Sequence, residues 1–150
     1  MIDVSDTENI ELIKNILDSQ HLAVLASVYQ GSPYNNLVAF AATDDLKSII
    51  FTTSRNTRKY NNIMANENVA LLIDSRNIGP PDFSHALALT VLGAAREIKG
   101  DEKTVTMSLY LKKHPHLEGF VNNADNAVMK VTVSDYIIAR FDKAEHVSVK

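Results

Sequence analysis

Hydroxyl and cationic side chains crowd one short segment of the sequence. Thr52 and Thr53 end an apolar run, and Thr57, Arg58 and Lys59 follow where a helix is expected to begin. The positive end of a helix dipole disfavours each cation by about 0.3–1 kcal/mol. A bound phosphate would remove that conflict, because it accepts hydrogen bonds from helix N–H groups, hydroxyls and both cations. The segment therefore predicts a phosphate site, and the competing interpretation is a solvated helix start whose basic residues face water.

Other residues that could do chemistry form weaker patterns. His114 and His116 flank a proline without a matching acidic partner, so we expect surface residues and no metal site. Asp44 and Asp45 lie between two apolar runs and are typical of a turn. The sequence has no Gly-x-Ser-x-Gly elbow and no glycine loop of the dinucleotide or Walker type. We therefore assign no catalytic residue.

Composition narrows the class of protein. The chain has 150 residues, a net charge of −3 and no cysteine. This charge argues against general nucleic-acid binding, and the missing thiols exclude disulfides and thiolate metal sites. No apolar stretch approaches the about 20 residues that cross a bilayer, and no signal peptide is visible. We expect a cytoplasmic protein without a membrane partner and a single domain over residues 1–150.

The elements that must position the polar segment form an α+β pattern. An amphipathic helix is predicted to end near Ser19, and Gly93 is expected at a bulge or close approach. Three strands precede the first internal helix, which favours a mostly antiparallel sheet, and six strands with few helices favour a small barrel. The predicted strands are residues 21–28, 34–43, 48–53, 69–74, 86–98 and 127–141, where the ordered core ends; helices are predicted at 56–66 and 101–113 and after 115, and a loop at 76–84.

Two stretches carry a resemblance to a known family. These are HLAVLASVYQGSPYNNLVAF (residues 21–40) and IIFTTSRNTRKYNNIMANENVALLID (residues 49–74). They resemble the FMN-binding split-barrel proteins related to pyridoxamine 5'-phosphate oxidase, in which a strand ending in Thr or Ser precedes a helix that starts with Arg-Lys. The resemblance covers residues 20–100 well and implies a six-stranded split β-barrel with flanking helices.

The resemblance also implies where a cofactor binds. It places the flavin phosphate on Thr53, Thr57, Arg58 and Lys59. It lays Asn36, Leu37 and Val38 along the ribityl chain and ring of FMN, with Phe51 and Thr52 close by. The family binds FMN at the interface of a homodimer, so Arg76 and Asn77 are expected to serve the partner's flavin.

Departures from the family pattern shape the functional hypothesis. Asn36 stands where the oxidases often have an arginine, and the chain lacks their terminal Arg-x-His motif. The resemblance thus implies an FMN-binding oxidoreductase that acts on an unidentified small-molecule redox substrate and is not a true pyridoxamine phosphate oxidase. The alternatives are a deazaflavin-dependent reductase of the same fold and a non-enzymatic flavin- or haem-binding module. Residues 140–146 faintly resemble a stretch of haem-utilisation relatives.

Overall fold

The computed structural model describes residues 4–76, 86–140 and 143–150. In chain order the elements are α1 (Val4–Ser19), β1 (Leu22–Tyr29), β2 (Ser32–Ala42), β3 (Ser48–Ser54), α2 (Arg58–Ala65), β4 (Asn68–Asp74), β5 (Leu87–Ile98), α3 (Gly100–Lys113), the 3-10 turn η1 (Pro115–Leu117), α4 (Glu118–Asn122), β6 (Asn126–Arg140) and β7 (Ala144–Ser148). Asn77 and most of the predicted 76–84 loop lie outside the described residues, as do residues 141–142.

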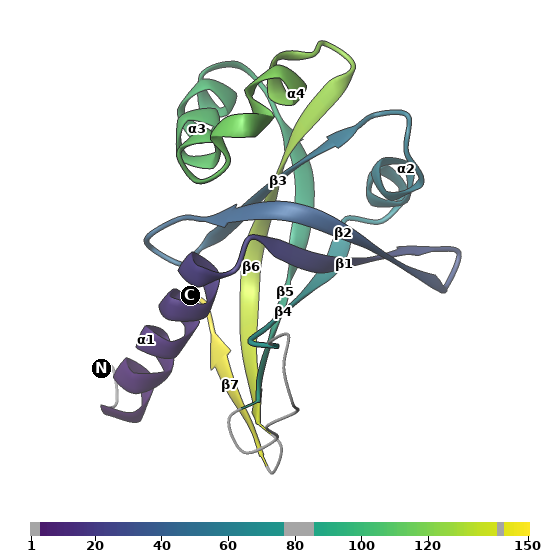
Figure 1. Cartoon of the computed structure of the whole chain (residues 1–150). Helices are drawn as coiled ribbons and strands as arrows, with labels where there is room; N and C mark the ends of the chain where they lie inside the picture. Colours follow the sequence, from purple (N-terminus) through teal and green to yellow (C-terminus); the bar gives the residue numbers. More distant parts are fainter. Residues whose placement is uncertain (1–3, 77–85, 141–142) are drawn as a thin grey trace.

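Six strands close into a barrel (Figure 1). The sheet order is β3-β2-β1-β4-β5-β6-β7, and β3 also pairs with β6, so the first six strands in this order form a ring. All of these strand pairs are antiparallel. The predicted α+β class and the six-stranded barrel with flanking helices are thereby confirmed.

A seventh strand lies outside the ring and was not predicted. β7 pairs with residues 135–139 of β6, in the half of β6 that does not contact β3. Its sequence, Ala-Glu-His-Val-Ser, has a single large apolar residue, and its side chains alternate between exposed and half-buried. A short, polar edge strand gives little hydrophobic signal. The prediction that the ordered core ends with β6 was therefore wrong.

The barrel interior and α1 share one hydrophobic core. Ile13 and Leu17 of α1 are buried together with Phe40, Phe51 and Met129 from the barrel wall. Each such side chain contributes about 1.5–3 kcal/mol by leaving water. The predicted amphipathic helix is confirmed, and its apolar stripe closes one end of the barrel.

A second apolar layer covers the outside of the barrel beneath α3 and α4. Ile50, Ile98 and Val128 point outward from the strands and pack with Tyr110 and Val121 of the two helices. In Figure 1 these helices lie together at the opposite end of the molecule from α1. β3 is therefore buried on both faces, which explains why its sequence is a nearly continuous apolar run.

Gly93 marks the expected irregularity in the longest ladder. The register between β5 and β6 shifts at Leu92 and Gly93. A Cβ atom at Gly93 would lie 2.4 Å from the carbonyl oxygen of Thr132, a distance that no side chain tolerates. This close approach requires glycine, and the predicted bulge is confirmed.

Candidate functional site

The ladder between β2 and β3 is short. These strands pair only where Phe40–Ala42 meet Ile49–Phe51, whereas β3 pairs with β6 along its whole length, Ser48–Ser54. Beyond Phe40 and Phe51, residues 36–39 and 52–54 run without a ladder between them, and we call this region the β2–β3 split. The two strands diverge there toward the side on which α2 lies (Figure 1).

Backbone groups of β2 face the split. The amide of Phe40 donates to the carbonyl of His21 on the β1 side. Because alternate residues of a strand point their N–H and C=O groups to opposite edges, the groups of Leu37 and Ala39 point toward β3. The Ala39 carbonyl accepts a hydrogen bond from the Tyr110 hydroxyl at 3.2 Å. The N–H and C=O of Leu37 are thus placed to hydrogen-bond a ligand lying between the strands.

Thr53 and Thr57 meet where β3 leads into α2. Their hydroxyl oxygens are 3.1 Å apart, and the Thr57 hydroxyl donates to the carbonyl of Ser54 at 2.8 Å. Thr57 is the N-cap of α2, and its hydroxyl accepts from the amide of Tyr60. Thr53 is only 1% exposed, so it holds Thr57 in place and has little surface to offer a ligand. The predicted pair is therefore brought together, but with different roles.

Arg58 and Lys59 occupy the first two positions of α2. The guanidinium of Arg58 is exposed and lies 4.7 Å from the centre of the Tyr34 ring. Lys59 is half-buried, and this burial lowers the pKa of its ammonium group. The first turn of α2 has no acidic residue, and within the described residues neither cation has a carboxylate partner. Two uncompensated cations thus stand at the positive end of a helix.

Asn36 brings an unsatisfied acceptor to the same region. Its Oδ1 atom is buried and has no hydrogen-bond partner. Asn36 lies on β2 between Tyr34, which contacts Arg58, and Val38. Buried polar atoms without a partner are rare and costly, so this oxygen is suited to accept a hydrogen bond from a ligand hydroxyl.

The other predicted β2 and β3 residues differ in exposure. Val38 and Phe51 are core residues, the backbone groups of Val38 point toward β1, and Phe51 is paired with residues on both neighbouring strands. Leu37 is 64% exposed on the outer face of the barrel. Thr52 is half-buried, and its hydroxyl lies 3.0 Å from that of Tyr110.

Arg76 lies away from this cluster. It forms a bidentate ion pair with Asp74, at 2.6 Å between its Nη2 and Oδ2 of the carboxylate. β4 starts at Asn68, near α2, and ends at Asp74, so its seven residues separate the two ends by about 20 Å. Arg76 is therefore not part of the Thr57–Lys59 cluster of its own chain.

Two side chains with candidate roles near the split were not predicted from the sequence. Tyr110 reaches into the split, and His114 is only 2% exposed, with its Nε2 2.7 Å from the carbonyl of Phe40. The expectation that His114 lies on the surface was wrong, because it supplies the donor for a strand carbonyl beside the start of β1. The signal that could have linked the two residues is their spacing of four at the end of the helix predicted at 101–113, which places them on the same side.

Two further observations limit the chemistry of the site. No group of three or more His, Cys, Asp or Glu side chains is arranged to hold a metal ion in the part of the chain that the structure describes. Asp44 and Asp45 form the predicted turn, in which the Asp45 carboxylate accepts from Thr43 at 2.6 Å.

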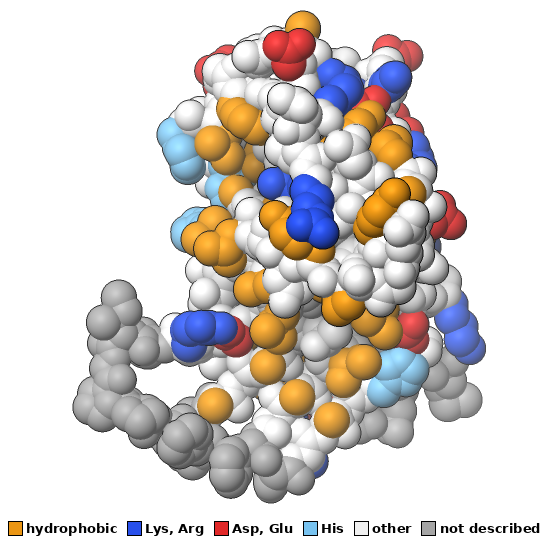
Figure 2. Space-filling view, turned by 90° about the vertical axis from the view of Figure 1, so that its right-hand side faces the viewer, with side chains coloured by type: hydrophobic (Ala, Val, Ile, Leu, Met, Phe, Trp, Pro, Cys, Tyr) orange, Lys and Arg blue, Asp and Glu red, His pale blue; other side chains and the backbone are white. Residues whose placement is uncertain are grey.

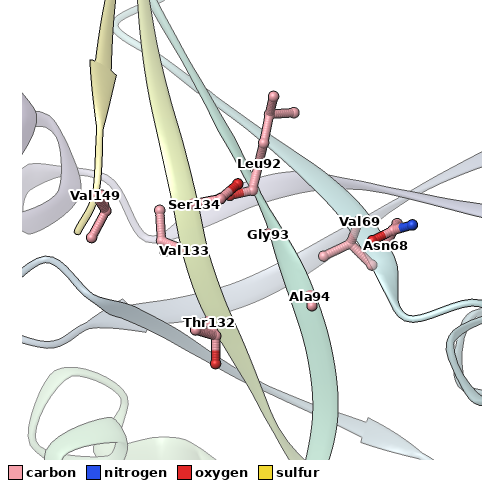
Figure 3. Close-up of a pocket in the computed structure, with 9 residues that line it drawn as sticks. All are labelled: Asn68, Val69, Leu92, Gly93, Ala94, Thr132, Val133, Ser134 and Val149. Atoms are coloured by element: carbon pink, nitrogen blue, oxygen red, sulfur yellow. The ribbon is translucent and has the colours of Figure 1, made fainter.

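A separate hollow of about 580 Å³ lies at the Gly93 bulge (Figure 3). Residues of β4, β5 and β6 line it together with Val149, and none of them is charged. It includes none of the residues of the split or of the α2 start.

An apolar row crosses the outer face of three strands. Leu37 lies opposite Val24, which in turn lies opposite Leu72, so β2, β1 and β4 present them side by side. Leu37 and Leu72 are both exposed. Figure 2 shows a face on which hydrophobic side chains gather around a few basic ones.

None of the helices in the described residues combines the length and apolar character needed to span a bilayer.

Solved structures of other proteins have the same fold. A heme binding protein from Mycobacterium smegmatis superposes with a TM-score of 0.82 at 15% identity, covering 93% of this chain and 57% of that one. General Stress Protein 26 from Bacillus anthracis superposes with a TM-score of 0.73 at 18% identity, covering 95% of this chain and 99% of that one. HutZ, a heme storage protein from Vibrio cholerae, superposes with a TM-score of 0.68 at 16% identity, covering 82% of this chain and 88% of that one. This chain thus spans little more than half of the mycobacterial protein.

The sequence itself was compared with curated proteins and with protein families. No curated protein matches it. The sequence model of the family described as Pyridoxamine 5'-phosphate oxidase matches residues 10–138, which include five strands of the ring in full and β6 except for its last two residues. The chain therefore belongs to the pyridoxamine 5'-phosphate oxidase family.

Proposed function

We propose that the protein binds FMN in the β2–β3 split, with the phosphate at the start of α2. The observation that carries this proposal is the pair of uncompensated cations, Arg58 and Lys59, on the first turn of a helix capped by Thr57. A phosphate dianion would pair with both cations and accept from the free N–H groups of the helix. It would convert an unfavourable helix start into a favourable one.

The split suits the rest of the cofactor. Leu37 offers a backbone donor and acceptor on the edge that faces β3, which matches the alternating polar edge of a flavin ring. Asn36 offers an acceptor to the hydroxyls of a sugar-alcohol chain. When bound, FMN would supply the electron-transfer chemistry, and the protein would hold and orient it. This supports an oxidoreductase acting on a small-molecule substrate, with no side chain assigned as acid or base.

We further propose that the protein is a homodimer with the flavin near the interface. The row of Leu37, Val24 and Leu72 is an apolar surface suited to a second copy. Arg76, far from the cations of its own chain, would then approach the partner's flavin.

The dimer has a direct test with a matched control. Leu37→Glu would place a charge in the interface, and we expect light scattering to report a monomer. Val105 is 74% exposed on α3, away from the row, so Val105→Glu should leave the dimer intact. Equal masses for the two variants would contradict the proposed interface.

The cofactor is tested by titrating the purified chain with FMN and with riboflavin, which lacks the phosphate. We expect FMN to bind at equimolar ratio, with a shifted visible spectrum, and riboflavin to bind much more weakly. Equal affinities would show that the phosphate is not recognised. A deazaflavin that displaces FMN would favour the reductase alternative. Bound FMN that no nicotinamide donor reduces would favour a non-enzymatic module.

Haem is the second candidate. Two of the similar structures are described as heme-binding and heme-storage proteins. In this chain the rings of His21 and His116 lie 5.9 Å and 6.2 Å from that of His114, and both are exposed, so an imidazole could reach an iron. An intense haem band after incubation with hemin, lost in His21→Ala or His116→Ala, would favour this candidate. Hemin that elutes free would exclude it.

A further inference from the structure

Tyr110 occupies the point at which β2 and β3 separate. It extends from α3, and its side chain is 1% exposed. Its hydroxyl lies 3.2 Å from the Ala39 carbonyl on β2 and 3.0 Å from the Thr52 hydroxyl on β3. One side chain therefore bridges the two strands directly beyond the last pair of their ladder.

The direction of these two hydrogen bonds is fixed by chemistry. A carbonyl oxygen can only accept, so the single hydroxyl proton of Tyr110 goes to Ala39. The bond between Tyr110 and Thr52 must then use the proton of Thr52. Once its proton is engaged, the Thr52 oxygen can only accept further hydrogen bonds. Tyr110 thus sets both the separation of the strands and the polarity that Thr52 presents to the split.

His114 strengthens this attachment from the other edge of β2. It follows Tyr110 by four residues, and their rings are 5.0 Å apart. Its Nε2 donates to the Phe40 carbonyl, which points toward β1, whereas the Ala39 carbonyl points toward β3. The end of α3 therefore contacts β2 through two successive carbonyls on opposite edges.

We propose that Tyr110 is a positioning residue for the cofactor, which fixes the width of the β2–β3 split and makes Thr52 a hydrogen-bond acceptor toward the bound ligand. This inference rests on the proposed function, because it places that ligand in the split. It adds that the ligand presents an N–H or O–H group to Thr52.

A second buried tyrosine provides a matched control. Tyr136 is also 1% exposed, and its hydroxyl donates to the Leu46 carbonyl at 2.7 Å. Leu46 lies in the β2–β3 turn, at the paired end of the two strands and away from the split. Tyr110→Phe and Tyr136→Phe therefore each remove one buried hydroxyl that donates to a backbone carbonyl, but only the first removes it from the split.

The first experiment compares these variants by hydrogen–deuterium exchange without ligand and by FMN titration. We expect Tyr110→Phe to speed exchange in residues 36–42 and 49–54 and to weaken FMN binding about fivefold to tenfold, the usual effect of one lost hydrogen bond. Tyr136→Phe should leave FMN affinity unchanged. Equal behaviour of the two variants would overturn the inference.

Thr52→Val distinguishes positioning from simple support. If Tyr110 acts in part through Thr52, the double variant Tyr110→Phe with Thr52→Val should lose less FMN affinity than the sum of the two single losses. Additive losses would overturn the role of Thr52. A wild-type chain that ignores FMN would refute the proposed function instead, and the exchange measurement would still support or overturn the positioning role of Tyr110.

Discussion

The two edges of β3 differ in how they are completed. Toward β6 the ladder runs from Ser48 to Ser54 without interruption, whereas toward β2 it ends at Phe51. On the open edge, the Tyr110 side chain of α3 bridges the two strands where the backbone bonds stop, and the polar residues of the α2 start follow. The comparison teaches that this barrel leaves one edge of β3 partly unpaired by ending a ladder early, while the opposite edge of the same strand is paired along its whole length.

Two arginines beside β3 show the same contrast. Arg55 donates to Glu97 of β5 at 2.6 Å and to the Ala124 carbonyl just before β6 at 2.7 Å, so it connects the end of β3 to the fully paired side of the barrel. Burial raises the pKa of Glu97, but hydrogen bonds from Arg55 and Lys99 outweigh it and lower that pKa overall. Arg58, three residues later, contacts only an aromatic ring in the described structure. The first arginine is committed to hydrogen bonds within the protein, whereas the second has no carboxylate partner among the described residues.

Removing the free cations is expected to have the largest effect. In Arg58→Ala with Lys59→Ala, each lost contact to a phosphate costs about 1.5–3 kcal/mol, so FMN affinity should fall at least about 100-fold. Riboflavin affinity should not change, because riboflavin has no phosphate. The melting temperature should stay level or rise slightly, since two cations leave the positive end of a helix. Calorimetry with both flavins and thermal unfolding measure these effects.

Arg55→Ala is the control for that prediction. It leaves the carboxylate of Glu97 without its closest partner, so we expect a lower free energy of unfolding and an unchanged FMN affinity. If Arg55→Ala weakened FMN binding as much as the double variant does, the contrast between the two arginines would be refuted.

Disturbing the β5–β6 ladder should lower the free energy of unfolding and leave the FMN affinity of the candidate site unchanged. Gly93→Ala forces a Cβ against the Thr132 carbonyl, a backbone atom that cannot move aside cheaply. Overpacking of this kind costs about 1–3 kcal/mol, which urea unfolding would detect as an earlier midpoint. FMN affinity of the folded fraction should match that of the wild type. An unchanged midpoint would show that the bulge can relax.

The candidate site could be predicted from the sequence where its signal was local. Two cations at an expected helix start conflict with the helix dipole within one turn, and this conflict is visible without a structure. The capping residue, however, is Thr57, and the helix begins at Arg58, two residues later than predicted. The burial of Thr53 depends on the barrel closing around it, which no local pattern encodes.

Non-local features were correspondingly missed. Tyr110 lies 58 residues after Thr52 in the chain, and only the packing of α3 across β3 brings their hydroxyls together. The burial of His114 likewise requires the Phe40 carbonyl to lack a strand partner. Helices and strands with strong apolar periodicity were predictable, whereas contacts that repair the end of a ladder depend on knowing where that ladder ends.

Thr57 allows a finer test of the open edge. Thr57→Ala removes the N-cap hydroxyl and should cost about 0.5–2 kcal/mol of stability. It should also weaken FMN binding, because the first turn of α2 loses its fixed geometry beside the phosphate. Thr57→Ser keeps the hydroxyl and should restore both properties. A serine variant as weak as the alanine variant would show that the methyl group, and not the hydroxyl, matters.

The smallest expected effect is a pH dependence at the attachment of α3 to β2. Burial lowers the pKa of His114 below its usual 6.5 despite its bond to Phe40, and the neighbouring Lys113, His21 and His116 lower it further. Tyr110 contacts the same ring without charge at these pH values. Because the unfolded chain takes up this proton more readily, the stability that neutral His114 provides is complete above pH 6.5 and is lost as the pH falls through the lowered pKa.

His114→Gln isolates that contribution. Glutamine can still donate to the Phe40 carbonyl but does not titrate, so the melting temperature of this variant should fall less between pH 7 and pH 5 than that of the wild type. Burial also lowers the pKa of Lys113 to about 8, and its ammonium group donates to the Leu17 carbonyl of α1. Its proton therefore penalises the folded state below pH 8, and stability should rise with pH between about 8 and 10.5. Identical acid profiles for the wild type and His114→Gln would show that the attachment of β2 to α3 does not sense protons, and would leave the open edge of β3 governed by Tyr110 alone.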